Sequence, residues 1–402
     1  MGSTRTYFRT QDRAIGDCPP PRWRSAAGLV SALADAYERG WQPADVMHVT
    51  RRTLGASVAS TAAAAVLFQA RTCRADDRAP ADWRAQLART AAAEPDAARL
   101  ADAVPPDAGP DDFAAVLDTA DRQLDTRDWL DLTVLWLDFP RLTRLCPPPS
   151  EWSAVPVSEP AEHPGTPDPK MLARVRGLLA KAEATEFVEE AETFTAKAQD
   201  LMTQYAISAA LLDADRPRAT TVHSRRIHLD NPYVREKVHL LTAIGEANRV
   251  RTVWFDRFAI ATVVGDALDL DQTELLFTSL LVQATRAMHA AGTVGTAGAG
   301  TGGTTTQFRK AFLFGFSVRI GQRLKETDSR ATAQVAVDAD VRIDDLLPVL
   351  AARSAAVDAE FDRLFPTTKA ARGRTVDAVG WHAGQSAADA ASLSPGERAL
   401  PR

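Results

Sequence analysis

Residues 168–212 read DPKMLARVRGLLAKAEATEFVEEAETFTAKAQDLMTQYAISAALL, and this stretch decides the fold of the chain around it. Asp168 can cap a helix that begins at Pro169, where the missing N–H of proline costs nothing. Apolar residues then recur every three or four positions, which lines one face of a helix. Thr185 can cap a second helix with a similar stripe. Because the connection between the stripes is short, the sequence predicts a helical hairpin over 168–212.

A hairpin of this size cannot bury enough apolar surface to be stable alone, so its stripes need a partner surface. Residues 151–215 carry a net charge of −7, whereas residues 216–330 carry +6. We therefore expect the hairpin to pack on the domain that follows it and to cover part of the basic surface of that domain.

The hairpin carries a recognisable pattern at Lys170, Leu178–Ala182, Glu190–Met202 and Tyr205–Ile207. With this pattern it resembles the bacterial and phage domain of unknown function 2786. A second and more distant pattern is found at Phe308–Lys310, Phe312, Gly315–Phe316, Arg319, Arg323–Leu324, Arg353–Ser354, Val357, Phe365–Pro366, Trp381–Gly384 and Ala387–Ala388. Through it, residues 222–393 resemble domain of unknown function 7168. Neither resemblance implies a catalytic residue.

The composition is that of a globular protein. Of the 402 residues, 45% are hydrophobic and 25% are charged, which leaves room for two or three domains. Arginine outnumbers lysine 40 to 7, as in proteins from GC-rich bacterial genomes. The polar start and the absence of a long apolar run predict a soluble cytoplasmic protein. Cys18, Cys73 and Cys146 are far apart, so we expect neither a disulfide framework nor a zinc cluster.

The N-terminal part, residues 1–146, is predicted to be an all-helical domain. Helical spacing of apolar residues marks Trp23–Arg39, Pro43–Leu54, Ser57–Arg71, Trp83–Ala93, Phe113–Leu124 and Trp129–Leu145. The last of these segments is the most apolar, and we expect it to be the central helix. Residues 147–167 are rich in proline and acidic residues, which predicts an extended and mobile linker.

Residues 216–402 are predicted to form an α+β domain with C-terminal helices. The alternation over Thr221–Leu229 is typical of a strand, and residues 249–266 favour a β-hairpin that turns near Asp256. With helices over Pro232–Asn248 and Asp269–His289, the order is β-α-β-β-α around a small antiparallel sheet. Further helices are expected over Gln307–Thr327, Ile343–Phe365 and Val376–Leu393, the first of them after a flexible glycine- and threonine-rich loop over 292–306. The fold class is therefore mostly α with a small α+β part.

Motifs of known catalytic chemistry are missing from the sequence. There is no nucleophile elbow, no P-loop and no metal-binding His pattern, so no cofactor and no metal are expected. Small residues at Ala383, Ala387 and Ala391 favour close helix packing. The segment 216–330 supplies the basic residues that could contact nucleic acid: Arg225, Arg226, Arg249, Arg251, Arg309, Lys310, Arg319 and Arg323.

These observations favour a binding or interaction protein that is not an enzyme, with nucleic acid as its ligand through the basic segment. Two alternatives remain open. One is an enzyme of unrecognised type, in which Trp381 and His382 act with Arg319 or Arg323. The other is a scaffold that binds only protein, which an exposed apolar area on the N-terminal bundle would favour.

Overall fold

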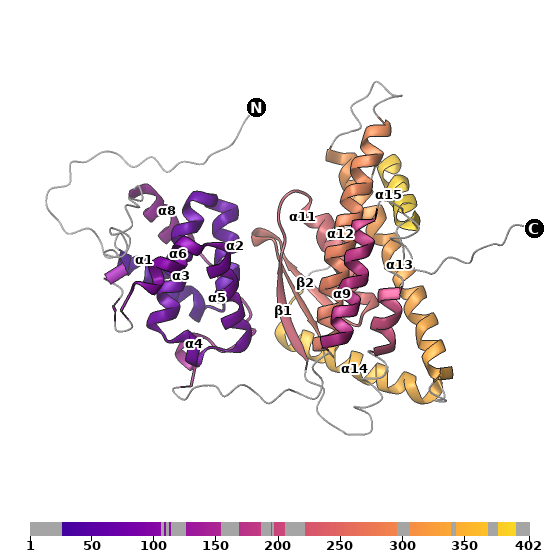
Figure 1. Cartoon of the computed structure of the whole chain (residues 1–402), viewed down its shortest axis with the longest axis horizontal. Helices are drawn as coiled ribbons and strands as arrows, with labels where there is room; N and C mark the ends of the chain where they lie inside the picture. Colours follow the sequence, from indigo (N-terminus) through magenta and orange to yellow (C-terminus); the bar gives the residue numbers. More distant parts are fainter. Residues whose placement is uncertain are drawn as a thin grey trace, which may run out of the picture. The chain divides into compact units, whose positions relative to one another are not determined.

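The computed structural model describes residues 26–105, 108–109, 112–113, 126–153, 169–185, 194, 197–205, 222–295, 306–338, 343–368 and 377–390. The chain divides into two compact units, residues 1–158 and residues 159–402. The described residues are mostly helical and include a small three-stranded antiparallel sheet in the second unit, as the sequence predicts (Figure 1). None of the described helices combines the length and the apolar composition that a membrane crossing requires.

The first unit is a helical bundle. It contains α1 (Ala26–Glu38), α2 (Pro43–Leu54), α3 (Ala56–Thr72), α4 (Ala75–Arg78), α5 (Ala81–Ala93), α6 (Pro95–Asp102), α8 (Thr126–Leu137) and the short 3-10 helix η2 (Pro149–Glu151). The sequence predicts five of these helices and misses α4 and α6. Its sixth segment, Phe113–Leu124, lies outside the described residues apart from Phe113. The centre of the bundle is aromatic, and its largest fully buried side chains include Tyr37, Trp41, Phe68, Phe113 and Trp136.

Helix α8 ends at Leu137, eight residues earlier than the sequence predicts. Pro140 follows, and the guanidinium of Arg39 donates to the carbonyl oxygens at the end of the helix, those of Trp136 at 2.8 Å and Leu137 at 2.9 Å. Phe139, the first apolar residue after the end of α8, stacks on Trp41 with ring centroids 3.9 Å apart. The turn after α1 therefore terminates α8 by contacts that are distant in sequence.

The proline-rich segment begins as part of the first unit. Ser150 hydrogen-bonds to the carboxylate of Glu38 through its backbone N–H at 3.0 Å and its hydroxyl at 2.7 Å. Trp152 is buried and packs edge-on against Trp83 at 5.3 Å. Residues 147–153 are therefore docked, in contrast to the extended linker expected from residue 147, because an apolar anchor lies among the prolines. The rest of that expected linker, 154–167, lies outside the described residues.

In the second unit, the described apolar residues of both stripes of the predicted hairpin are buried or partly buried. The first forms α9 (Pro169–Ala184), and residues 197–205 are helical in the second. Val175, Leu179 and Met202 belong to one hydrophobic cluster with Leu276 and Leu280. These last two residues lie on α12 (Ala267–Gly295), along which α9 packs (Figure 1). The hairpin thus packs on the domain that follows it, as its stripes require.

The small sheet has the predicted β-α-β-β-α order. Its elements are β1 (His223–His228), α11 (Val234–Ala247), β2 (Arg251–Phe255), the 3-10 turn η3 (Asp256–Phe258) and β3 (Ile260–Gly265). The strand order is β1-β3-β2, and both pairings are antiparallel. All of β3 is buried, because Ala261 and Val263 face the main cluster while Val264 packs with α14 (Ile343–Leu364) on the other side.

Two further helices pack against each other at very short range. They are α13 (Thr306–Asp338), which ends eleven residues later than predicted, and α15 (Ala378–Ala390). A Cβ added at Gly384 would overlap the carbonyl oxygen of Phe312, and one added at Gly315 would overlap that of Trp381. The sequence correctly indicates close packing of α15, but the face with the closest backbone approach carries Gly380 and Gly384 instead of the predicted row that begins at Ala383.

Candidate functional site

Two of the predicted nucleic-acid-binding arginines are held by carboxylates of α12. Arg225 on β1 pairs with Asp271 at 2.9 Å and with Glu274 at 2.7 Å. Arg249 is half-buried and pairs with Asp269, which is buried, at 3.0 Å and with a carboxylate of α13. Burial alone would lower the pKa of each guanidinium, but the charges and hydrogen bonds of the carboxylates outweigh it and raise both pKa values.

Three more members of the predicted set contact the C-terminal helices. Arg251 pairs with Asp358 of α14, and Arg319 pairs with Asp389 of α15. Arg323 donates to the carbonyl oxygens near the end of α15, including that of Asp389 at 3.0 Å. These arginines already interact with the C-terminal helices, so a phosphate group would have to displace a partner that is already in place.

The remaining predicted members are Arg226, Arg309 and Lys310. Arg226 is half-buried on β1. Arg309 and Lys310 stand at the start of α13 and form no ion pair with any residue that the structure describes. The sequence predicts a loop over 292–306, but α12 continues to Gly295 and α13 begins at Thr306, so both helices extend into the predicted loop. Residues 296–305 lie outside the described residues. Of the predicted set, Arg309 and Lys310 are therefore the most available to bind an anion.

The alternative site at Trp381 and His382 is not assembled. His382 is exposed on α15, whereas Arg319 and Arg323 are engaged with the end of the same helix. Within the described part of the chain, no three His, Cys, Asp or Glu side chains are grouped as metal ligands would be. Burial raises the pKa of Cys73 to about 11, which disfavours the reactive thiolate.

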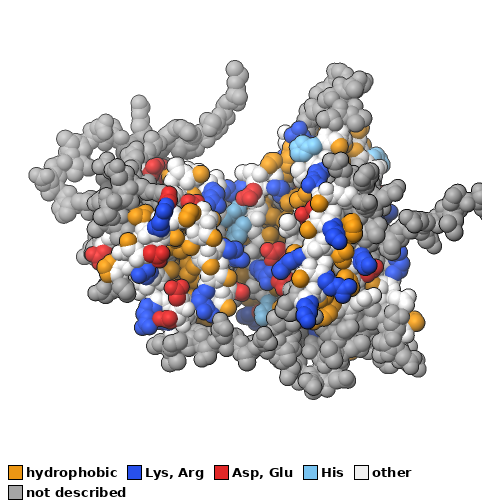
Figure 2. Space-filling model, in the orientation of Figure 1, with side chains coloured by type: hydrophobic (Ala, Val, Ile, Leu, Met, Phe, Trp, Pro, Cys, Tyr) orange, Lys and Arg blue, Asp and Glu red, His pale blue; other side chains and the backbone are white. Residues whose placement is uncertain are grey.

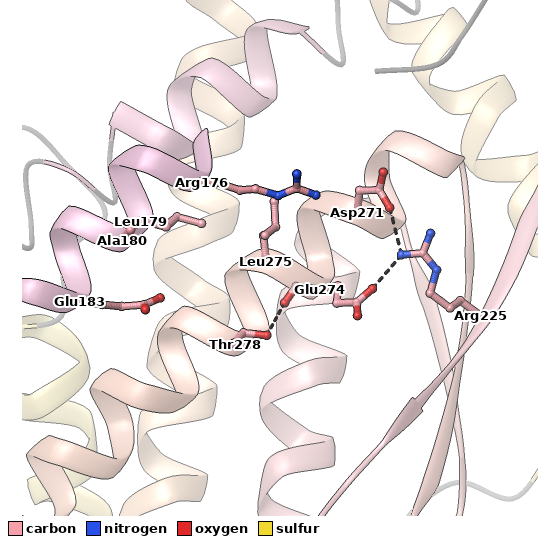
Figure 3. Close-up of a pocket in the computed structure, with 9 residues that line it drawn as sticks. All are labelled: Arg176, Leu179, Ala180, Glu183, Arg225, Asp271, Glu274, Leu275 and Thr278. Carbon is pink, nitrogen blue, oxygen red and sulfur yellow. Dashed lines mark hydrogen bonds and ion pairs between the residues drawn. The ribbon is translucent and has the colours of Figure 1, made fainter. Parts of the chain in front are cut away.

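A cavity of about 350 Å³ lies between α9, α12 and the start of β1 (Figure 3). Leu179 and Ala180 of α9 and Leu275 of α12 give it an apolar part. Its polar rim is formed by Arg176, Glu183, Arg225, Asp271, Glu274 and Thr278. The volume falls at the lower end of the range that small-molecule sites occupy.

The charges around this cavity differ in their availability. Arg225 is shared by Asp271 and Glu274, and the dashed lines in Figure 3 mark both ion pairs. Arg176 and the carboxylate of Glu183 make no hydrogen bond or ion pair with any described residue. Both project from α9 toward the gap in front of α12. The cavity therefore offers one available cation and one available anion on the same helix.

The outward face of α9 is basic. Lys170, Arg174 and Lys181 are exposed and fall within about 40° of one another around the helix axis at 100° per residue. The other exposed positions of this face are small, and Gly177 has open space where a Cβ would stand. Arg174 makes no ion pair with any described residue, and Lys181 lies 5.6 Å from the ring centroid of Phe194. Figure 2 shows the Lys and Arg side chains gathered over this helix.

The sequence prediction misses this face because it averages charge over too long a segment. Residues 151–215 are strongly acidic as a whole, but α9 itself contains four Lys or Arg and a single carboxylate, Glu183. If charges were counted for the first predicted helix alone, and separately for each face of that helix, the count would reveal the basic row. The charge of α9 is therefore opposite in sign to the total of residues 151–215, and the acidic residues at 186–192 lie outside the described residues.

Comparison with known families supports the identity of the hairpin alone. Residues 170–209 match the family described as protein of unknown function (DUF2786). The comparisons give no support to the resemblance of 222–393 to domain of unknown function 7168. No curated protein and no solved structure matches the chain. Both the basic face of α9 and the cavity wall formed by Arg176, Leu179, Ala180 and Glu183 thus lie within the segment that matches a family of unknown function.

Proposed function

We propose that this protein binds nucleic acid without catalysing a reaction on it, and that the outward face of α9 is the contact surface. The row of Lys170, Arg174 and Lys181, with no carboxylate among the exposed positions described on that face, carries this proposal. The row spans about 16 Å at 1.5 Å per residue, which equals about five steps of one strand in duplex DNA. Small neighbours such as Gly177 let a sugar-phosphate backbone approach closely.

This contact surface differs from the set of basic residues that the sequence favours. A guanidinium that already pairs with a carboxylate, such as Arg225 or Arg251, exchanges one anion for another when it binds phosphate. It therefore gains less than a cation such as Arg174, which pairs with no carboxylate among the described residues. Arg309 and Lys310 are the exception and form the competing surface within the predicted set.

The two surfaces can be compared with matched variants. Arg174→Gln/Lys181→Gln and Arg309→Gln/Lys310→Gln each remove two positive charges from exposed or half-exposed helix positions. The affinity of each protein for labelled single-stranded DNA, RNA and duplex DNA would be measured by fluorescence anisotropy between 50 and 200 mM salt. Three phosphate contacts predict that affinity falls about 20- to 40-fold over that range.

For the α9 variant we expect weaker binding at every sequence and a salt dependence reduced by about 1.4 to 1.8 in logarithmic slope. The α13 variant should bind as the unchanged protein does. Loss of binding in the α13 variant alone would move the interface to Arg309 and Lys310. Absence of binding at 50 mM salt, or binding without a salt slope, would refute nucleic acid as the ligand.

A further inference from the structure

The cavity beside α9 has features that a phosphate surface does not need. Leu179 projects from α9 and Leu275 from α12 into the gap between the two helices (Figure 3). Leu179 is only 3% exposed, and with Leu275 and the exposed Ala180 it gives the cavity an apolar surface on which one face of a flat ring can lie. The polar groups then stand at the edges of that ring.

The two available charges specify what those edges must carry. Arg176 and Glu183 are seven residues apart on α9, about 10 Å along the helix axis, and their side chains are long enough to reach a ligand that lies between them. Arg176 offers only donors, and the carboxylate of Glu183 offers only acceptors. A well-matched ligand therefore presents an acceptor edge toward Arg176 and a donor edge toward Glu183.

Among the nucleobases, guanine presents these two edges together. Its O6 and N7 atoms accept a bidentate pair of hydrogen bonds from arginine, a common contact in nucleic-acid recognition. Its N1–H and N2–H groups donate in parallel and match the two oxygens of a carboxylate. Adenine has a single amino group beside N7, and the pyrimidines have one small ring. We propose that the cavity binds a guanine base that is unstacked from a single strand lying on α9.

The guanine site depends on the proposed function in one respect, because the bound nucleic acid is what supplies the guanine base. Arg176 and Glu183 lie about a third to half a turn around α9 from the row of Lys170, Arg174 and Lys181, and the small exposed positions Ala173, Gly177 and Ala180 lie between the two. A single strand that crosses α9 over these small residues can contact the row with its phosphates and place one base in the cavity, whereas a duplex keeps its bases stacked and paired. We therefore expect single strands that contain guanine to bind more tightly than other strands.

Nucleosides test the cavity without the phosphate surface. Guanosine, inosine, adenosine and cytidine would be titrated into the full-length protein by calorimetry. We expect guanosine to bind best and inosine, which lacks the N2 amino group, to bind about tenfold more weakly. Glu183→Gln and Arg176→Gln should each weaken guanosine about tenfold or more, and their thermal midpoints report whether the fold is intact. Arg174→Gln is the control, and it should leave guanosine binding unchanged while it weakens binding of a strand.

The outcomes separate the two proposals. If nucleosides bind equally or not at all up to millimolar concentration, or if Glu183→Gln binds guanosine normally, the cavity is not a guanine site. That result leaves the phosphate surface to be judged by the salt dependence of strand binding. If guanosine binds specifically but the affinity for strands does not depend on salt, the guanine site is supported and the proposed nucleic-acid function is refuted.

Discussion

Gly384 offers the sharpest test of how the second unit is held together. A Cβ at this position would overlap the carbonyl oxygen of Phe312 and lie 2.8 Å from its carbonyl carbon and 2.9 Å from its Cα. All three atoms belong to the backbone of α13, so no side-chain rotation can relieve the contact. We predict that Gly384→Ala forces α15 away from α13 by about 0.6 Å or more, the shortfall from the 3.4 Å at which ordinary contact begins.

The magnitude follows from a comparison with Gly177, which also lies within a helix. Replacing a helical glycine by alanine stabilises the helix by about 1 kcal/mol, and this gain applies to both positions. Gly177 has open space around the new methyl group, so Gly177→Ala should keep the full gain. Overpacking against a fixed backbone costs about 3 kcal/mol or more, which leaves Gly384→Ala destabilised by about 2 kcal/mol. The two variants should therefore differ by about 3 kcal/mol despite identical chemistry.

Differential scanning calorimetry of the full chain measures this difference. The second unit spans residues 159–402, a size at which 1 kcal/mol shifts the midpoint of unfolding by about 2–4 °C. We expect its transition to fall by about 4–8 °C in Gly384→Ala and to rise by about 2–4 °C in Gly177→Ala. If both variants gained stability equally, α13 and α15 would not pack through this glycine, and the argument from close approach would be refuted.

Three further predictions concern half-buried ionisable groups. Arg249→Met should destabilise the second unit by about 3–5 kcal/mol in urea denaturation, because the buried carboxylate of Asp269 loses its closest partner; an unchanged urea midpoint would argue against this ion pair. Burial, and secondly the charge of Asp269, raise the pKa of Asp266 above 3.8, so the folded state binds this proton more tightly and stability declines as pH rises above that value. Asp266→Asn should remove this decline in urea midpoints measured from pH 4 to pH 7, and a slope equal to that of the unchanged protein would contradict it. Cys73, with its pKa near 11, should react slowly with iodoacetamide at pH 8 until urea unfolds the first unit, whereas rapid labelling of the folded protein would show that the thiol is accessible.

Local signals account for the parts of the fold that the sequence predicts. Helix α2 runs from Pro43 to Leu54 as expected, because proline at the first position and Gly55 after the last are recognisable without any other part of the chain. The β-hairpin of β2 and β3 is likewise encoded by neighbouring residues that turn near Asp256. Where the end of an element depends on a distant partner, the prediction fails. Helix α8 stops at Leu137 because Arg39 binds its last carbonyl groups, and nothing near α8 in sequence reveals that contact.

The packing face of α15 was ambiguous for a different reason. Small residues recur every four positions both from Gly380 and from Ala383, so the period predicts close packing without identifying the side on which it occurs. The choice is made by α13, whose Gly315 complements the first row. A single amphipathic pattern therefore predicts that a helix is buried, whereas the face of closest approach is a property of two helices together.

The proposed contact surface differs from the residues that the sequence favours because the effect of a charge on a ligand depends on distance. Exposed charges more than about 10 Å apart are largely screened at 0.1 M salt, so a bound phosphate responds to a few side chains on one helix face. The acidic total of 151–215 is an average over a much longer range, and it conceals the cations of α9 from Lys170 to Lys181. The positive total of 216–330 misleads in the opposite direction, since Arg225, Arg249 and Arg251 are each matched by a carboxylate. The charge that a ligand contacts is therefore decided by the pairing of side chains in space, which is why we place the proposed binding surface on the hairpin and not on the most basic segment.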